Sequence, residues 1–415
     1  MGGDLTEMIA RRTLRVLFWS HLALGVVAGL AIALLAATGI AMSFESVVID
    51  RMERSLMTRH ATPLGAPPMG VDRMMALARE RFPDMRDPVL EVRSDPALPW
   101  IYRTGRGERH YLHPANGDDL GAGPERARRL FQAVVSLHRW LVWQPEGGIR
   151  RGGAVRENEG ERREPGGWRK WGGAITSAAC LIYLTLALTG LPLWLRGIRG
   201  MVALRAKCWF RRGLSGKARD WNWHHVLGWW ALPGILTITL TGTIMAYPWA
   251  NAALFAAFGE SPPARASGAP PGESPRQRSP RTPAAPPPAP ANLGTVPRLA
   301  AERMPGWKTL EISRPAADGG APVRIIIGDA GRGRPDRRIG FSLTEVGLVP
   351  NAVPNGDPTP AARARRWVRW IHTGEAGGWW GQVLAVGVCS ATLVLVWTGY
   401  ALTWRRWTRF RKPMI

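Results

Sequence analysis

Four long apolar blocks interrupt an otherwise polar chain of 415 residues. None of them contains Asp, Glu, Lys or Arg, and they cover residues 22–44, 171–195, 221–259 and 376–404. A helix that crosses the ~30 Å hydrocarbon core of a bilayer needs about 20 mostly apolar residues. The pattern therefore predicts four membrane-spanning helices and an α-helical integral membrane protein.

Basic residues gather in the short segments beside these blocks. Three arginines precede the first block, and more basic residues fill the loop 196–220 and the tail 405–415. Short cytoplasmic loops carry the excess of Lys and Arg in membrane proteins. We therefore expect both termini and this loop in the cytoplasm, with the chain in a bacterial inner membrane. The long connections, roughly 45–170 and 260–370, then face outward.

The chain is internally duplicated. The first block reads WSHLALGVVAGLAIALLAATGIAMSF and the third reads WHHVLGWWALPGILTITLTGTIMAYPW. A gapless alignment places His21 on His224 and the Thr-Gly pair 38–39 on the pair 241–242. The second and fourth blocks share the endings TGLPLW and TGYALTW. The sequence thus predicts a four-helix transmembrane core built from two parallel repeats.

The two outer segments echo each other as small α+β units, at 45–130 and 293–360. The spacing of apolar residues in the first unit predicts a helix over 70–84 and then strands at 88–93, 99–103 and 109–113. The second unit shows the same order, with a helix near 296–304 and strands near 308–313, 322–328 and 337–343. A Pro-, Ala- and Ser-rich linker, residues 260–292, precedes the second unit. Edge helices before the second and fourth spans are expected within 131–195 and 361–404.

The charge and cysteine content narrow the function classes. The formal net charge is +24, from 55 Lys and Arg against 31 Asp and Glu. Because this charge flanks membrane spans, membrane lipid is the expected contact and nucleic acid is not an expected partner. Three cysteines without a Cys-x-x-Cys motif exclude a disulfide framework, a zinc module and covalently attached c-type haem.

Four of the eight histidines recur at equivalent places in the two halves. His21 and His224 lie near the cytoplasmic ends of the first and third spans, and His138 and His372 precede the second and fourth spans. A single interfacial histidine commonly bonds lipid headgroups, but two symmetric pairs at opposite depths favour a functional role. Haem iron accepts neutral imidazoles from two facing helices, so we expect haem. Small residues beside the ligands would make room for the macrocycle: Gly25, Gly29, Gly228 and Gly234.

The remaining histidines are weaker candidates for haem ligands. His225 follows His224 directly and points about 100° away on a helix. The repeat selects His224, so His225 is expected to be a neighbouring contact or a fallback ligand. His60, His110 and His113 lie in the first outer unit without symmetric partners, and they are interpreted as surface residues or, alternatively, as substrate contacts.

These motifs together resemble the PepSY-associated transmembrane family. The resemblance rests on LFWSHLALGVVAGLAIALLAATGIAMSF, SLHRWLVW, DWNWHHVLGWWALPGILTITLTGTIM, WIHTGEAGGWWGQ and the two block endings. HPANGDDLG looks like the end of a PepSY domain, while SLTEVGLV at 342–349 retains little of that pattern. The likeness covers nearly the whole chain except the linker and an insertion near 144–168. The two outer segments would then be PepSY-like units.

The resemblance implies iron uptake, and within the family some members are siderophore reductases with two b-type haems. On that pattern His21 and His224 would hold the cytoplasmic-side haem, and His138 and His372 the outer haem. Arg139 and Arg369 would contact haem propionates. They belong to a set of arginines near the outer ligands that could instead be interfacial anchors: Arg128, Arg129, Arg139, Arg366 and Arg369.

The implied activity is reduction of a ferric siderophore, iron(III) to iron(II), at the periplasmic face. The chain lacks a nucleotide or flavin motif, so the electron donor would be a flavoprotein, a quinol or a cytosolic reductant. The catalytic residues remain unassigned. Two alternatives stay open: a non-enzymatic PepSY binding or chaperone-like membrane module, and a haem subunit that delivers electrons to a protein partner.

Overall fold

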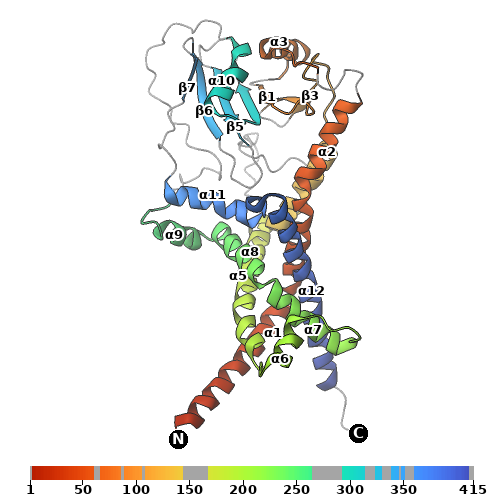
Figure 1. Ribbon diagram of the computed structural model, residues 1–415, viewed down its shortest axis with the longest axis vertical. Helices are drawn as coiled ribbons and strands as arrows, with labels where there is room; N and C mark the ends of the chain where they lie inside the picture. The colour runs from red at the N-terminus through yellow and green to blue at the C-terminus, as the bar shows by residue number, and fades with distance from the viewer. Residues whose placement is uncertain are drawn as a thin grey trace.

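The computed structural model describes residues 2–59, 66–85, 88–104, 108–143, 167–263, 292–313, 323–329, 338–344, 347–350 and 359–410. A bundle of long helices carries a β-sheet at one end, and both chain termini lie at the other end (Figure 1). We call these the sheet end and the basic end. Most of the linker and of the insertion near 144–168 lies outside the described residues.

Three continuous helical stretches are long and apolar enough to cross a membrane: Arg11–Thr58, Gly167–Leu195 and Glu375–Thr408. They contain α1 (Gly2–Ser43) with α2 (Glu45–Thr58), α5 (Gly167–Leu195), and the short 3₁₀ turn η2 (Glu375–Gly377) with α12 (Gly378–Phe410). Lengths of this order match the bilayer core. Three of the four spans predicted from sequence are therefore present as continuous helices.

The third predicted span is bent. It consists of α7 (Gly216–Trp230) and α8 (Leu232–Ala246), whose axes differ by 63°, followed by α9 (Pro248–Ala256). Pro233 has no N–H to donate to the preceding turn, which weakens the helix at the junction. Together the two helices form a fourth candidate span.

The three long helices and the bent pair pack as a ring. The helix α1 contacts α5 and α12, and the bent pair α7–α8 contacts the same two helices. Consequently α5 and α12 occupy opposite corners, and each half of the repeat contributes two neighbouring spans. The short helix α6 (Met201–Cys208) closes the basic end beside α7 (Figure 1).

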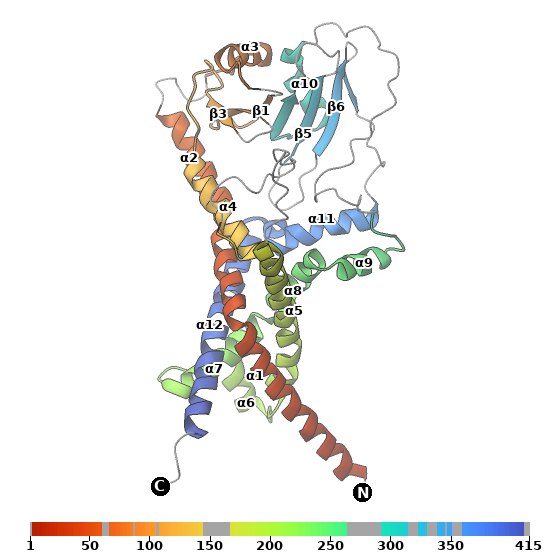
Figure 2. The same cartoon turned by 180° about the vertical axis from the view of Figure 1, so that it is seen from behind.

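Two edge helices lie between the bundle and the sheet. α4 (Glu125–Trp140) runs along α1 and α5, while α11 (Pro360–His372) packs across α8 and α9. In Figure 2 α11 and α9 lie across the top of the bundle, whereas α2 continues α1 toward the sheet. The two halves thus keep the same element order but differ in one element: α2 continues α1 toward the sheet, whereas α9, which follows the bent pair, lies across the bundle.

The two outer units form a single antiparallel sheet of seven strands in the order β3-β2-β1-β4-β5-β6-β7. The strands are β1 (Val89–Arg93), β2 (Trp100–Arg103), β3 (Arg109–Leu112), β4 (Thr309–Ser313), β5 (Val323–Gly328), β6 (Arg338–Thr344) and β7 (Gly347–Pro350). The first six agree with the sequence prediction, and β7 was missed.

The junction between the units is the pairing of β1 with β4, in which Glu91 faces Glu311. Pairing removes two exposed strand edges, which explains why the units do not stay separate. One core unites them beneath α3 (Val71–Arg81), the 3₁₀ turn η1 (Leu293–Thr295) and α10 (Val296–Arg303), and it includes Met74, Leu310 and Ile325. The two α+β units predicted from sequence thus share one sheet and one core.

A buried carboxylate ties the sheet to the helices. Glu53 on α2 is 1% exposed and pairs with Arg93 of β1 and Arg128 of α4. The hydroxyl of Tyr111 on β3 donates to the same carboxylate at 3.1 Å. Burial raises the pKa of Tyr111 to about 12, so this hydroxyl keeps its proton at neutral pH. The first half of the sheet is thereby fixed to α2 and α4.

Candidate functional site

The four histidines of the repeat occupy two levels of the bundle. His21 on α1 and His224 on α7 lie toward the basic end, and we call them the inner pair. His138 on α4 and His372 on α11 lie toward the sheet end, and we call them the outer pair. Each pair takes one residue from each half of the chain.

Every one of these imidazoles contacts the threonine of a Thr-Gly pair in its own half. The distances between Nδ1 and Oγ1 are 3.0 Å for His21 and Thr189, 2.8 Å for His138 and Thr38, 3.0 Å for His224 and Thr398, and 3.1 Å for His372 and Thr241. The same contact is thus made four times, once for each span. Sequence reasoning found both motifs but did not connect them.

The threonine contacts fix which ring nitrogen carries the proton, as His372 illustrates. The hydroxyl of Thr241 lies 2.6 Å from the carbonyl of Thr237 in its own helix, and that carbonyl can only accept. The single hydroxyl proton is therefore used, and the oxygen accepts from Nδ1–H of His372. The carbonyl of Ile238, 3.0 Å from the same Nδ1, requires the same proton position. Nε2 is left with a free lone pair.

The other three threonines repeat this pattern. Their hydroxyls donate to carbonyls four residues earlier at 2.7–2.8 Å: Thr38 to Leu34, Thr189 to Thr185, and Thr398 to Val394. All four histidines are thus held as the tautomer that offers Nε2. In metal-binding histidines a hydrogen bond at one ring nitrogen orients the other toward the metal. The arrangement suits axial ligation by four nitrogen atoms.

The glycine of three Thr-Gly pairs lies against the ring that its threonine holds. A Cβ atom added there would meet the imidazole Cε1 of its histidine at 3.4 Å for Gly190, 3.2 Å for Gly242 and 3.8 Å for Gly399. The fourth glycine, Gly39, instead faces the sulfur of Cys389 at 3.3 Å. The motif therefore combines a hydroxyl that bonds Nδ1 with a glycine that, in three of the four cases, lies beside the same ring.

Two of the predicted glycines are open beside the inner pair. Gly25 and Gly228 follow the inner histidines by one helical turn, and an added Cβ would meet nothing within 4 Å at Gly25 and only a leucine methyl at 3.8 Å at Gly228. Gly29 and Gly234 serve another purpose, because their added Cβ atoms would lie 2.7 Å and 2.3 Å from Tyr400 and Val388. Those two glycines permit close helix packing, so only half of the predicted set leaves room.

The outer pair is neutral at physiological pH. Burial lowers the pKa of His138 to about 4, and the nearby His372 and Arg139 act in the same direction. Burial also lowers the pKa of His372. The two outer imidazoles are close enough to interact electrostatically, as are His21 and His224 of the inner pair. A neutral imidazole is the form that binds iron.

His225 belongs to a different environment. Its Nδ1 lies 2.8 Å from the carbonyl of Trp221, and its ring stacks on that indole at 4.0 Å between centroids. The ring centroids of His224 and His225 are 6.2 Å apart, and only His224 contacts a threonine of a Thr-Gly pair. The geometry therefore favours His224 as the ligand, as the repeat predicts.

The arginines near the outer pair differ in their contacts: one is held by a carboxylate, and others lie where they could bind an anion. Arg128 is held by Glu53, which makes it structural. Arg139 and Arg169 both lie over the ring of Trp140, with guanidinium carbons 4.5 Å and 4.3 Å from its centroid. Burial, followed by the charge of Arg169, lowers the pKa of Arg139. Two guanidinium groups beside one ring would gain from an anion, and Arg369, one turn before His372, is placed similarly on α11.

The histidines of the first outer unit do not join the site. His113 is 2% exposed within the turn after β3, so it is not a surface residue as predicted. His110 stacks on Phe82 at 3.8 Å. His60 lies outside the described residues. Within the described part of the chain no three His, Cys, Asp or Glu side chains form a metal-binding group, so the paired imidazoles are the donor set to consider.

Comparison with known proteins identifies one family. The model of the PepSY-associated TM region matches residues 18–406, which include all four histidines and all four Thr-Gly pairs. A search of curated proteins finds no match. Because the family match covers nearly the whole chain, the protein belongs to the PepSY-associated transmembrane family.

Proposed function

We propose that this protein is a haem-b electron-transfer protein of the bacterial inner membrane that reduces ferric siderophores at its sheet end. The observation that carries the proposal is the fourfold repeat of one contact, in which a threonine accepts from Nδ1–H and leaves Nε2 of a histidine free. Two such imidazoles at each of two levels fit two haems per chain.

The residues present suit haem b in three respects. The donor set consists of neutral imidazole nitrogens, which are common axial ligands of haem iron. Gly25 leaves open space beside the inner pair. Arg139 and Arg369 offer cationic partners for propionates near the outer pair. Bound haem would supply reversible one-electron chemistry, and the protein would supply ligand orientation, burial and spacing.

The orientation follows from charge. The basic end carries the Lys- and Arg-rich loop and tail, so the positive-inside rule places it in the cytoplasm. The sheet then lies in the periplasm. Because β1 pairs with β4, no gap separates the two outer units, and the ferric complex would approach between the sheet and the bundle. Charged residues on that sheet, including Arg103 and Glu311 at 3.0 Å, face away from its apolar core.

Reduction suits a ferric siderophore for a chemical reason. Iron(III) is a hard cation that oxygen donors hold tightly, whereas iron(II) is bound less tightly by the same donors. One electron delivered to the iron therefore releases it without breaking a bond of the siderophore. The metal is the substrate here, and the siderophore can leave intact.

The decisive experiment is an absorption spectrum of the detergent-purified chain, oxidised and dithionite-reduced, with pyridine haemochrome quantification. We expect a b-type spectrum with two haems per chain. His138→Ala and His372→Ala should each remove the same haem, and His21→Ala and His224→Ala should each remove the other. His225→Ala is the matched control and should retain both.

Three outcomes would count against the proposal. A colourless protein after expression with ample haem would favour the non-enzymatic binding module. Loss of both haems in every single variant would contradict the assignment of separate inner and outer pairs. A haem-loaded protein that reduces no ferric siderophore unless a second protein is added would favour the electron-delivering subunit.

A further inference from the structure

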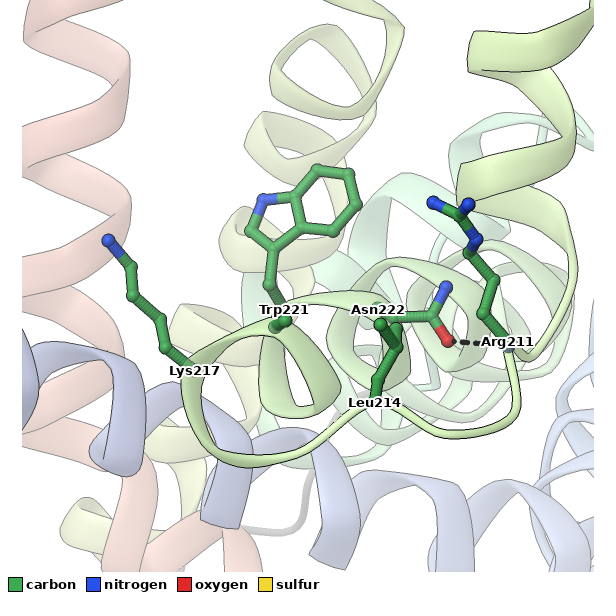
Figure 3. A pocket seen from close by; sticks show the side chains of 6 residues that line it. Arg211, Leu214, Lys217, Trp221 and Asn222 are labelled. Carbon is green, nitrogen blue, oxygen red and sulfur yellow. Dashed lines mark hydrogen bonds between the residues drawn. The ribbon is translucent and has the colours of Figure 1, made fainter.

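A cavity opens at the basic end along the first half of α7, the helix that also carries His224. It has a volume of about 410 Å³ and is lined by Arg211, Leu214, Lys217, Ala218, Trp221 and Asn222 (Figure 3). Volumes of this order are typical of small-molecule sites. The proposed orientation places it on the cytoplasmic side, where electrons must enter.

The wall of the cavity is fixed by a buried amide. Asn222 is 1% exposed, and its Nδ2 donates to the carbonyls of Ala206 at 2.9 Å and Trp209 at 3.1 Å. Its Oδ1 accepts from the backbone N–H of Arg211 at 3.1 Å. These three bonds hold the loop after α6 against α7, and they place the backbone of Arg211 beside the helix that carries Trp221.

The lining combines an aromatic face with two cations. Figure 3 shows the indole of Trp221 standing between the side chains of Lys217 and Arg211. The indole is 38% exposed. The adjacent carboxylate of Asp220 is turned away, since it is 1% exposed and pairs with Arg219 and Arg405. The site therefore suits a planar aromatic ligand with a negatively charged group.

The aromatic wall also connects the cavity to the inner pair. Trp221 stacks on His225 at 4.0 Å, and the ring of His225 lies 6.2 Å from that of His224, centroid to centroid. His225 therefore has a position between the cavity and a proposed ligand. This accounts for a histidine that has no equivalent in the first half of the chain, where Leu22 follows His21.

We infer that this cavity binds flavin mononucleotide in both its oxidised and reduced forms, and that the reduced form is the electron donor that the chain itself lacks. The inference rests on the proposed function. The isoalloxazine ring would stack on Trp221, and the phosphate would lie beside the guanidinium group of Arg211, with Lys217 on the other side of the indole. Oxidation of one FMNH₂ to FMN releases two electrons and two protons. The protons pass to water at the basic end, and the two electrons reduce two iron(III) complexes to iron(II).

Titration of the purified full-length chain with oxidised FMN, followed by flavin fluorescence, tests the inference. We expect saturable binding of one FMN per chain that weakens as salt is raised. Trp221→Leu should weaken binding about tenfold or more through the lost stacking. Arg211→Gln should weaken it about tenfold through the lost phosphate contact. Arg212→Gln, the next arginine and not a lining residue, is the matched control.

Riboflavin, which has the same ring without the phosphate, separates the two contributions. It should bind more weakly than FMN to the parent chain and equally weakly to Arg211→Gln. Absence of saturable FMN binding would overturn the inference, as would equal effects of Arg211→Gln and Arg212→Gln. FMN binding can be measured without haem, so a chain that fails to bind FMN leaves the proposed function intact. A chain that binds FMN but contains no haem would refute only the proposed function.

Discussion

The hydroxyl groups of Tyr183 and Thr392 lie 2.8 Å apart across the centre of the bundle. The two residues occupy equivalent repeat positions, each six residues before the threonine of its Thr-Gly pair. They come from α5 and α12, which stand at opposite corners of the ring. This hydrogen bond therefore joins the two halves between the levels of the inner and outer histidine pairs.

Removal of the Tyr183 ring should destabilise the bundle more than removal of its hydroxyl. Tyr183→Phe loses one hydrogen bond, worth about 0.5–1.5 kcal/mol, because Thr392 keeps its bond to the carbonyl of Val388. Tyr183→Ala leaves a cavity and should cost about 3–5 kcal/mol. Unfolding of the detergent-solubilised variants measures both. An alanine variant as stable as the phenylalanine variant would show that the ring does not fill the bundle centre.

The threonine contacts predict level-specific effects on haem. Thr38→Val and Thr241→Val should weaken only the outer haem, and Thr189→Val and Thr398→Val only the inner one, by about 10–100-fold in affinity. Valine keeps the shape but cannot accept from Nδ1–H. Haem content and spectroelectrochemical titration of each variant measure the effect.

Thr185→Val is the control for this series. The Thr185 hydroxyl donates to the carbonyl of Leu181 at 3.0 Å and lies one turn before Thr189 on the same helix. It should leave both haems unchanged. Equal losses in Thr185→Val and Thr189→Val would mean that the helix, and not the histidine contact, is being perturbed.

The duplication made much of this architecture predictable. Equivalent positions for His21 and His224, and for the Thr-Gly pairs, are visible in the sequence because the repeat preserves their spacing. The contact between His138 and Thr38 is not visible, since the two residues are 100 positions apart and meet only when α4 packs on α1. The separation of two residues along the chain does not determine whether they meet when their helices pack.

Other features depended on tertiary packing. An apolar block of uniform composition does not reveal where it bends, so the 63° angle between α7 and α8 was not expected. The pairing of β1 with β4 joins strands more than 200 residues apart. The alternation of apolar and polar residues predicts that each segment is a strand, but it does not predict which strands pair. The buried role of Glu53 was also missed, because a single acidic residue on a helix is usually exposed.

The Glu53 contacts predict that the sheet depends on one carboxylate. Glu53→Gln removes the carboxylate that Arg93 and Arg128 share; Arg93 keeps Glu91 at 3.2 Å, but the buried Arg128 loses its counter-charge, which should cost about 3–5 kcal/mol in the stability of the sheet. Asp95→Asn is the control, because its pair with Arg54 is largely exposed and should be worth about 0–1 kcal/mol. Thermal unfolding and limited proteolysis distinguish them. Equal effects would contradict a central role for Glu53.

Gly25 gives a direct test of where the inner macrocycle lies. An added side chain there meets no protein atom within 4 Å, so Gly25→Leu should fold normally. If the open space holds the haem, the leucine will fill it and abolish the inner haem signal while the outer one persists. Gly387→Leu, on α12, is the control, since Gly387 is exposed and equally open. Full haem content in Gly25→Leu would place the macrocycle elsewhere, while loss in both variants would point to general damage to the bundle.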